Sequence, residues 1–480
     1  MTTENTAASE RFMTLYPGVY TPREAGHVAK YLATNRALKE RGPIDAKALA
    51  AGTLPKDTPG LGPVVRATEE WVRYNNAKYD PENPLRNDKA YALEAGYDDI
   101  LAFPCFAAHD DTFMVPYPPA ARDTLLVSDL NHSVTSYLPI HPGDTLTMVA
   151  NEREMIDLTP PEGSIYRTVA IETKGSVYNQ RGELVNDVVF RVTESIKIYK
   201  DPSFAPANPS FFDMWESPDW FSRPVHVYTD ADWSAMRGIW ANEKIRGSTP
   251  RYWEDLAIGD RSPVTLDGPI EHSVTPSAPW GMGAGGSRTM KAEILNPANF
   301  ATMIRGDKDG LYRLPDEHAA NPAPPADWAP PPPPPGMDAG AIDTTDIHKD
   351  GTQRSPLINF MGREFAIRHL TNWMGDAGWL QNISWSIMDP RGHAKYGKPV
   401  PTNPKASHWL DRVPGLQGRF VEEHGLTQDV AIVKSVVTDK DVRDGVFLAH
   451  LVWWIETIDE KIWLEGSATI QLPSRHAKAG

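Results

Sequence analysis

The amino-acid sequence predicts an α+β protein built from two similar halves, in each of which an antiparallel sheet wraps around a central helix. Two observations carry this prediction. Long segments that are rich in β-branched residues and alternate in polarity occur in two groups, one ending near residue 200 and the other near residue 473. Each group follows a loop and an apolar segment that could be a buried helix or strand. This shared order indicates an internal duplication.

The first group of predicted strands lies in YLPIHPGDTLTMVA, SIYRTVAIETKGSVYNQRGELV and DVVFRVTESIKIYK, where Asn-Gln-Arg-Gly has turn chemistry. The second group lies in DVAIVKSVVTDKDV, GVFLAHLVWWIETID and KIWLEGSATIQLP. A single sheet of this kind leaves one edge open and one face of its helix partly exposed. Two copies that pair edge to edge remove both defects, so we expect the two halves to pair in that way.

The length of the chain, 480 residues, exceeds what one ordinary core can hold and indicates two to three domains. Its 44 prolines indicate long irregular connections. The predicted order is a helical extension (1–65), a first half (66–200), an aromatic and proline-rich linker (201–250) and a second half (251–475) with a proline-rich insertion at about 305–340.

The composition indicates which binding partners and which cellular compartment to expect. A net charge of −15 argues against a nucleic acid or an anionic membrane as partner. No apolar stretch approaches the roughly 20 residues of a membrane span, and MTTENTAASERFM lacks the features of a secretory signal. A single cysteine, Cys105, fits a cytoplasmic protein, and within AFPCFAA we interpret it as a small core residue rather than a nucleophile. His132 and His141 are predicted to be strand residues rather than catalytic groups.

One short segment of the second half has the residue types of acid–base chemistry. In GAIDTTDIHKDG, residues 340–351, Asp343 and His348 stand five residues apart, just before the apolar segment PLINFM. A carboxylate and an imidazole at that spacing in a loop can converge on one water molecule. The non-catalytic alternative is a solvated acidic loop in which the histidine has no special role. Asp346 and Asp350 are interpreted as residues that cap loop turns.

Two other patterns point to cofactors, and we expect neither. The cluster DxxDxHxD has metal-ligand residue types, but a calcium-type loop would need a bidentate Glu where Leu357 stands, so no metal is predicted. The stretch GMGAGGSR contains GxGxxG at Gly281, Gly283 and Gly286. It lacks a clear preceding strand and the acidic residue of a dinucleotide site, which favours a flexible loop.

Four motifs resemble those of a known family, the MaoC-like, (R)-specific enoyl-CoA hydratases and acyl dehydratases of the hot-dog fold. NPLRNDKAYA is similar to the family loop NPxHxDxxxA, and YLPIHPGDTL to its proline-glycine-aspartate strand entry. RYWEDLAIGD resembles the opening, and LEGSATIQLP the closing strand, of the second domain in two-domain members. The resemblance covers roughly residues 65–200 and 250–475 and implies two hot-dog domains in tandem.

The resemblance also implies catalytic residues. The family's Asp and His stand five residues apart in GDxNPxH, the spacing of Asp343 and His348, although Thr345-Asp346 replaces Asn-Pro. In the first half the matching positions are Pro81 and Arg86, so the pair is lost there. The second half is therefore predicted to be catalytic and the first half degenerate and shaped for substrate binding.

The activity that the resemblance implies is a hydro-lyase adding water reversibly to an enoyl-CoA, with no cofactor besides the CoA of the substrate. The enolate oxygen would be held by backbone N–H groups at the start of the central helix, among Asn359, Phe360, Met361 and Gly362. Where this chain has Asn359-Phe360-Met361, the family usually has His-Gly-Met. Arg86 would meet a phosphate or carboxylate of the ligand, the alternative being a surface arginine. The insertions suggest a bulky, non-fatty acyl group. A hot-dog thioesterase and a non-catalytic acyl-CoA-binding subunit remain as alternatives, and a homodimer or higher homo-oligomer is expected.

Overall fold

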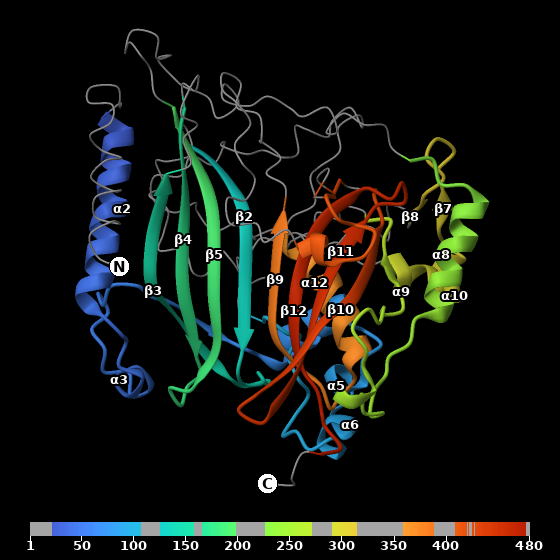
Figure 1. Cartoon of the computed structure of the whole chain (residues 1–480), viewed down its shortest axis with the longest axis horizontal. Helices are drawn as coiled ribbons and strands as arrows, with labels where there is room; N and C mark the ends of the chain where they lie inside the picture. The colour runs from blue at the N-terminus through green and yellow to red at the C-terminus, as the bar shows by residue number, and fades with distance from the viewer. Residues whose placement is uncertain are drawn as a thin grey trace, which may run out of the picture.

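One ten-stranded antiparallel sheet carries both halves of the chain (Figure 1). The computed structural model describes residues 22–106, 125–157, 166–197, 226–270, 290–313, 359–387, 409–419, 421, 425–426 and 428–476. The first half contributes β1 (Leu61–Arg66), β2 (Leu125–Ser136), β3 (Thr145–Asp157), β4 (Tyr166–Tyr178) and β5 (Leu184–Lys197). The second half contributes β6 (Thr265–Asp267), β9 (Trp379–Ile387), β10 (Ala431–Arg443), β11 (Val446–Glu456) and β12 (Ile462–Gln471).

The strand order confirms the internal duplication. From its outer edge inward, the first half runs β1-β3-β4-β5-β2, and the second half runs β6-β10-β11-β12-β9. Each strand therefore has a counterpart at the same place in the other half. The three strands predicted in each half are present as β3, β4 and β5 and as β10, β11 and β12.

The two halves join edge to edge, as expected. β2 pairs with β9 from Asn131 opposite Ser386 to Thr135 opposite Asn382. The Asn382 amide donates hydrogen bonds to Ser133 Oγ at 3.0 Å and Thr135 Oγ1 at 2.9 Å. Beside them the buried His132 ring stacks on Trp385, with ring centroids 5.1 Å apart. His132 is thus a strand residue as predicted. The prediction that His141 is also a strand residue is wrong, because it lies in the turn before β3, where its Nδ1 is 3.1 Å from Ile100 O.

The central helix of the second half is α12 (Asn359–Met374), which contacts β9, β10 and β11. Residues 362–374 of α12 are all buried, and they include the apolar Phe365, Ile367 and Leu370 as well as His369, which bonds to Ser435 of β10. Each such apolar side chain contributes roughly 1.5–3 kcal/mol by leaving water. Gly362 permits the close approach, since a Cβ there would come within 2.3 Å of Leu464 Cδ2. The sheet therefore wraps around this helix as predicted.

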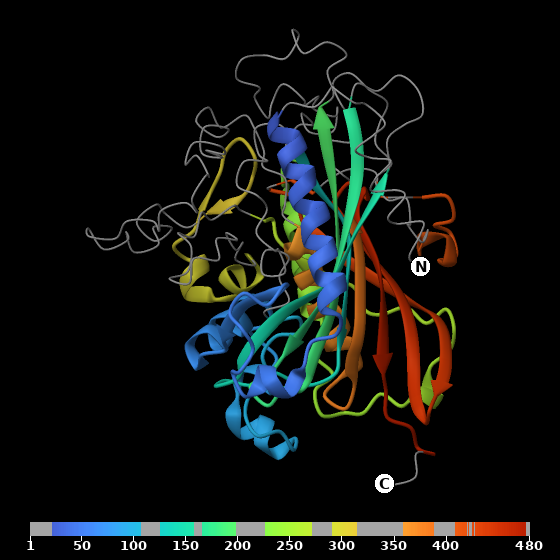
Figure 2. The ribbon, with the colours of Figure 1, turned by 90° about the vertical axis from the view of Figure 1, so that its left-hand side faces the viewer.

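A helix lies beside the outer edge of the first half of the sheet. The predicted helix of the extension is present as α2 (Pro22–Arg41), which lies along β3 and is followed by α3 (Ala46–Ala50) (Figure 2). β1 begins at Leu61, so the sheet already starts within the segment assigned to the extension. Among the described residues no helix is long and apolar enough to cross a membrane.

Two further segments differ from the sequence prediction. Residues 101–106 of LAFPCFAA form neither helix nor strand, although they are largely buried. They follow three short helices that were not predicted, α4 (Glu69–Tyr79), α5 (Pro84–Asn87) and α6 (Lys89–Glu94).

In the predicted linker, α8 (Asp230–Asn242) is capped by Thr229 and buries Trp233 and Trp240 in a core cluster. The elements α9 (Met290–Leu295), α10 (Pro297–Phe300), β7 (Ile304–Arg305) and β8 (Tyr312–Arg313) lie beside it.

Candidate functional site

The predicted acid–base pair lies outside the described residues, as do the GMGAGGSR stretch and the polyproline run. The structure does place the element that follows the pair. Asn359, Phe360 and Met361 form the first turn of α12, and Gly362 comes next. The backbone N–H groups of a first helical turn have no partner within the helix, and the helix dipole favours negative charge there. This end of α12 is therefore suited to hold an anion or a developing oxyanion.

Arg86 is buried, so the alternative of a surface arginine is wrong. It sits in α5, which begins at Pro84 and is capped by Asn83, whose side chain accepts from Leu85 N–H. Only 4% of Arg86 is exposed. Its Nε lies 3.2 Å from Asp80 Oδ2, and its Nη1 donates to Ala102 O at 2.7 Å. Burial raises the pKa of the Asp80 carboxyl, and the guanidinium of Arg86 opposes that rise.

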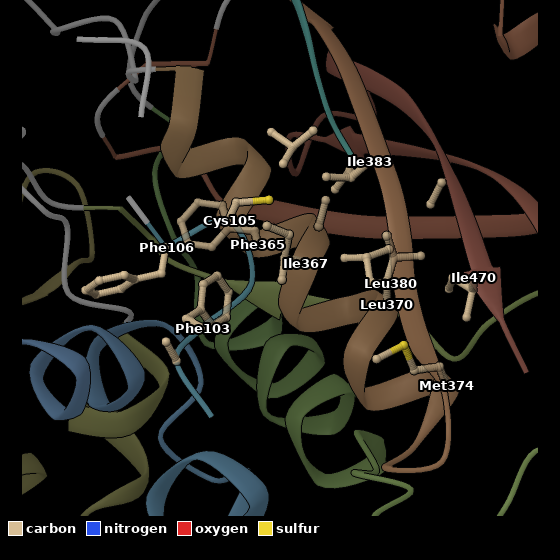
Figure 3. Packing of buried hydrophobic residues seen from close by; sticks show 14 of the residues in the cluster. Phe103, Cys105, Phe106, Phe365, Ile367, Leu370, Met374, Leu380, Ile383 and Ile470 are labelled. Carbon is tan, nitrogen blue, oxygen red and sulfur yellow. The ribbon is translucent and has the colours of Figure 1, made fainter. Parts of the chain in front are cut away.

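An apolar pocket opens beside Arg86, where the first-half loop meets the end of α12 and β9. Phe103, Cys105, Met374 and Leu380 contribute to its walls, and Figure 3 shows the loop residues facing α12. Polar side chains at its margin include Asn186, whose buried Nδ2 has no acceptor within the described residues. The enclosed part measures about 50 Å³, which takes only a few heavy atoms. A mostly apolar pocket with a few polar groups is typical of a small-molecule site.

Cys105 belongs to the wall of this pocket and is buried, which confirms the prediction of a core residue. Burial raises the pKa of its thiol to about 12. The thiol is therefore protonated near neutral pH, and a protonated thiol is a poor nucleophile.

A group of buried charges escaped the sequence analysis. Arg368 of α12 donates to Asp267 Oδ2 at 2.7 Å and to Glu243 Oε2 at 2.9 Å. Lys291 also donates to Glu243 and, at 2.5 Å, to Glu82 of the first half. The one available signal was a charged residue inside the apolar helical segment FAIRHL, since charges are rarely buried without partners.

His369, the neighbour of Arg368, has a structural role. Its Nδ1 lies 3.0 Å from Thr265 Oγ1 and its Nε2 lies 2.8 Å from Ser435 Oγ. Burial lowers the pKa of this imidazole to about 3, so it stays neutral at physiological pH. Within the ranges that the structure describes, no group of three or more His, Cys, Asp or Glu side chains could hold a metal ion.

The structure has two five-stranded antiparallel sets that share one strand order and join edge to edge, and a buried helix packs against the second set. This architecture defines a double hot-dog protein. Similar architectures occur among solved structures. A putative MaoC domain protein dehydratase from Chloroflexus aurantiacus is 12% identical over 88% of this chain and 100% of its own, with a TM-score of 0.39. A conserved hypothetical protein from Mycobacterium tuberculosis with a double hot-dog fold is 10% identical over 90% and 99% of the two chains, also with a TM-score of 0.39.

A MaoC-like dehydratase from Phytophthora capsici is 9% identical over 86% of this chain and 96% of its own, with a TM-score of 0.36. At such identities the likeness concerns the fold alone, and the strand order is the ground for assigning it. No protein-family model and no curated protein sequence matches the chain.

Proposed function

We propose that the protein is a hydro-lyase that reversibly adds water across the double bond of an enoyl-CoA thioester, with Asp343 and His348 as its acid–base pair. The observation that carries the proposal is the place of this pair in the chain. His348 stands 11 residues and Asp343 stands 16 residues before Asn359, the first residue of the buried central helix α12. A short connection of that length can bring both side chains to the helix start.

The chemistry requires a water activated at C3, a proton delivered to C2, and stabilisation of an enolate on the thioester oxygen. One member of the pair accepts the proton of the water, while the other orients the water or donates to C2. General acid–base assistance of this kind contributes roughly 10²–10⁴-fold in rate. Backbone N–H groups in the turn Asn359–Met361 would bind the enolate oxygen, a type of contact that is often the largest single catalytic contribution.

The first half supports binding rather than catalysis. Arg86 occupies the position at which the resembling family carries its catalytic His. A guanidinium stays protonated at any physiological pH, so Arg86 cannot act as the general base that activates water. It is also held by Asp80 and by Ala102 O. The adjoining apolar pocket would receive one end of the acyl group, and its enclosed volume of about 50 Å³ means that a bulky acyl group must extend beyond it.

The test is a spectrophotometric assay with crotonyl-CoA and with enoyl-CoA thioesters of bulkier acyl groups. We expect the absorbance of the conjugated thioester to fall without release of free thiol. Release of thiol would instead indicate a thioesterase, and lack of reaction with every enoyl-CoA would leave an acyl-CoA-binding subunit.

Substitutions within the loop separate the pair from its neighbours. Asp343→Asn and His348→Gln should each lower kcat by about 10²-fold or more, since each removes a proton-transfer group but keeps its size. Asp346→Asn and Asp350→Asn, which change the same charge in the same loop, should leave kcat within a few-fold. Circular dichroism checks that all four variants are folded. Near-normal turnover in either of the first two would rule out the pair.

A further inference from the structure

A second cavity, of about 300 Å³, lies between the first-half loop Asp80–Glu82 and the second half. Its inner wall consists of the buried side chains of Asp80, Asp267, Lys291 and Arg368. Its outer wall includes Leu295, which is 43% exposed, and the exposed Asn296. The cavity is thus charged at its inner end and has an apolar side chain near its mouth.

Ion pairs hold the inner wall together. Arg368 binds Asp267 Oδ2 through Nε at 3.1 Å and Nη2 at 2.7 Å. Glu243 Oε2 receives both Arg368 Nη1 and Lys291 Nζ, and Glu243 Oε1 accepts from Leu266 N–H at 2.8 Å. Both oxygens of Glu243 are therefore satisfied. The geometry of this wall is fixed by contacts from α12, β6 and α9.

One acceptor in this wall is left over. Asp267 is 1% exposed, and its Oδ1 has no hydrogen-bond donor in the described part of the chain. A buried carboxylate oxygen without a donor costs about 1–3 kcal/mol or more, so native structures rarely leave one unpaired. An N–H or O–H group supplied by a ligand would remove that cost.

The charge of the wall indicates which ligand. Among the described residues that line the cavity, three side chains are acidic, those of Asp80, Glu82 and Asp267, and two are basic, those of Lys291 and Arg368. One negative charge is thus in excess. Since the described residues offer no group of metal-ligating side chains, an organic cation fits better than a metal ion. We propose that this cavity binds the primary ammonium group of a small alkylamine, which donates to Asp267 Oδ1 while its alkyl chain lies against Leu295.

The proposal does not depend on hydro-lyase activity, and it is tested by calorimetric titration of the full chain at constant ionic strength. The probes are n-butylammonium, n-butanol and butyrate, which have similar size and different charge. We expect saturable binding of n-butylammonium only. Equal binding of n-butanol or butyrate, or no binding of n-butylammonium, would overturn the proposal, as would a response to Ca²⁺ or Mg²⁺ that n-butylammonium cannot displace.

Two variants locate the site. Asp267→Asn places an amide N–H donor where the accepting oxygen was, so it would face the N–H donors of the ammonium group. The affinity for n-butylammonium should therefore fall at least tenfold, as expected for loss of a hydrogen bond between charged groups. Leu295→Trp fills the exposed mouth without disturbing the ion pairs and should weaken binding as well, which keeps the test valid if Asp267→Asn fails to fold. Glu69→Gln, a change at an exposed helical pair, serves as the control and should bind normally. Unchanged affinity in Leu295→Trp would place the amine elsewhere.

Discussion

At the scale of single residues, Arg86 and Cys105 show how burial decides chemistry. Arg86, which lines the apolar pocket, retains its charge because the Asp80 carboxylate lies 3.2 Å from its Nε. For Cys105, burial outweighs the effect of the nearby Arg363 guanidinium and holds the thiol in the neutral form. An exposed cysteine reacts readily and an exposed arginine binds anions, yet here the surroundings make both residues structural.

Glu465 of β12 gives a residue-scale prediction. It is 7% exposed, its Oε2 has no donor among the described residues, and burial raises its pKa from 4.5 to about 7. Between those two values the folded protein binds a proton that the unfolded chain has released. The free energy of unfolding should therefore decrease as pH rises from about 4.5 to 7, by up to about 3 kcal/mol.

Chemical denaturation across this pH range measures the effect. Glu465→Gln removes the titrating group, so its free energy of unfolding should decline less with pH than that of the wild type and should exceed it at pH 7. Glu69→Gln, at an exposed position, should keep the slope of the wild type. The same slope in Glu465→Gln as in the wild type would show that this carboxyl does not titrate in the window.

At the scale of elements, α12 depends on the absence of a side chain at Gly362. By helix propensity alone, Gly→Ala inside a helix should stabilise by roughly 0.5–1 kcal/mol. At Gly362, however, the new Cβ would lie 2.3 Å from Leu464 Cδ2 and 3.0 Å from the Trp463 ring, both in the buried core. We expect Gly362→Ala to destabilise by about 1–3 kcal/mol, the range for overpacking a core.

Gly238 of α8 supplies the matched control, because nothing lies within 4 Å of the Cβ that it would gain. Gly238→Ala should raise the free energy of unfolding, while Gly362→Ala should lower it. Urea denaturation of both variants measures the two signs. A stabilising effect at both glycines would mean that Leu464 moves aside at little cost and that α12 packs less tightly than the structure indicates.

The strands that were predicted from the sequence are those whose residue pattern lies within the strand itself. β3, β4, β5, β10, β11 and β12 are each 10 residues or longer and contain many β-branched or aromatic residues. β6 has three residues and β1 contains Pro63, so neither gives a strand pattern by itself. Residues 101–106 are apolar because they are buried, although they belong to no helix or strand. Their composition alone therefore resembles that of a regular element. Their conformation depends on partners such as Asn76, which donates to Leu101 O from 25 residues away.

The candidate site was predicted only in part for the same reason. The resemblance of NPLRNDKAYA to a catalytic loop drew attention to Arg86, but its burial against Asp80 required the fold. The charged cavity joins Glu243 to Arg368 across 125 residues and Glu82 to Lys291 across 209. Pairs so distant leave no periodic pattern in the sequence, and only the central helix with its buried Arg368 hinted at them.

At the scale of the whole molecule, the halves share one sheet and should unfold together. Separation would expose the edges of β2 and β9, break the hydrogen bonds of Asn382, and unstack His132 from Trp385. It would also leave Lys291 without Glu82. Since both halves lose these contacts when either one unfolds, each stabilises the other, and a single cooperative transition is expected.

The positions of the tryptophans allow the expected single unfolding transition to be tested. Only Trp71 of the 15 tryptophans falls within residues 66–200, so tryptophan fluorescence reports chiefly on the remainder of the chain. Far-ultraviolet circular dichroism reports on the strands of both halves. The two signals should give the same midpoint in urea, and Asn382→Leu, which removes the side-chain hydrogen bonds at the β2–β9 junction, should shift both midpoints equally. A fluorescence transition separated from the dichroism transition would show that the halves unfold independently, because the junction would then contribute less than the stability of either half.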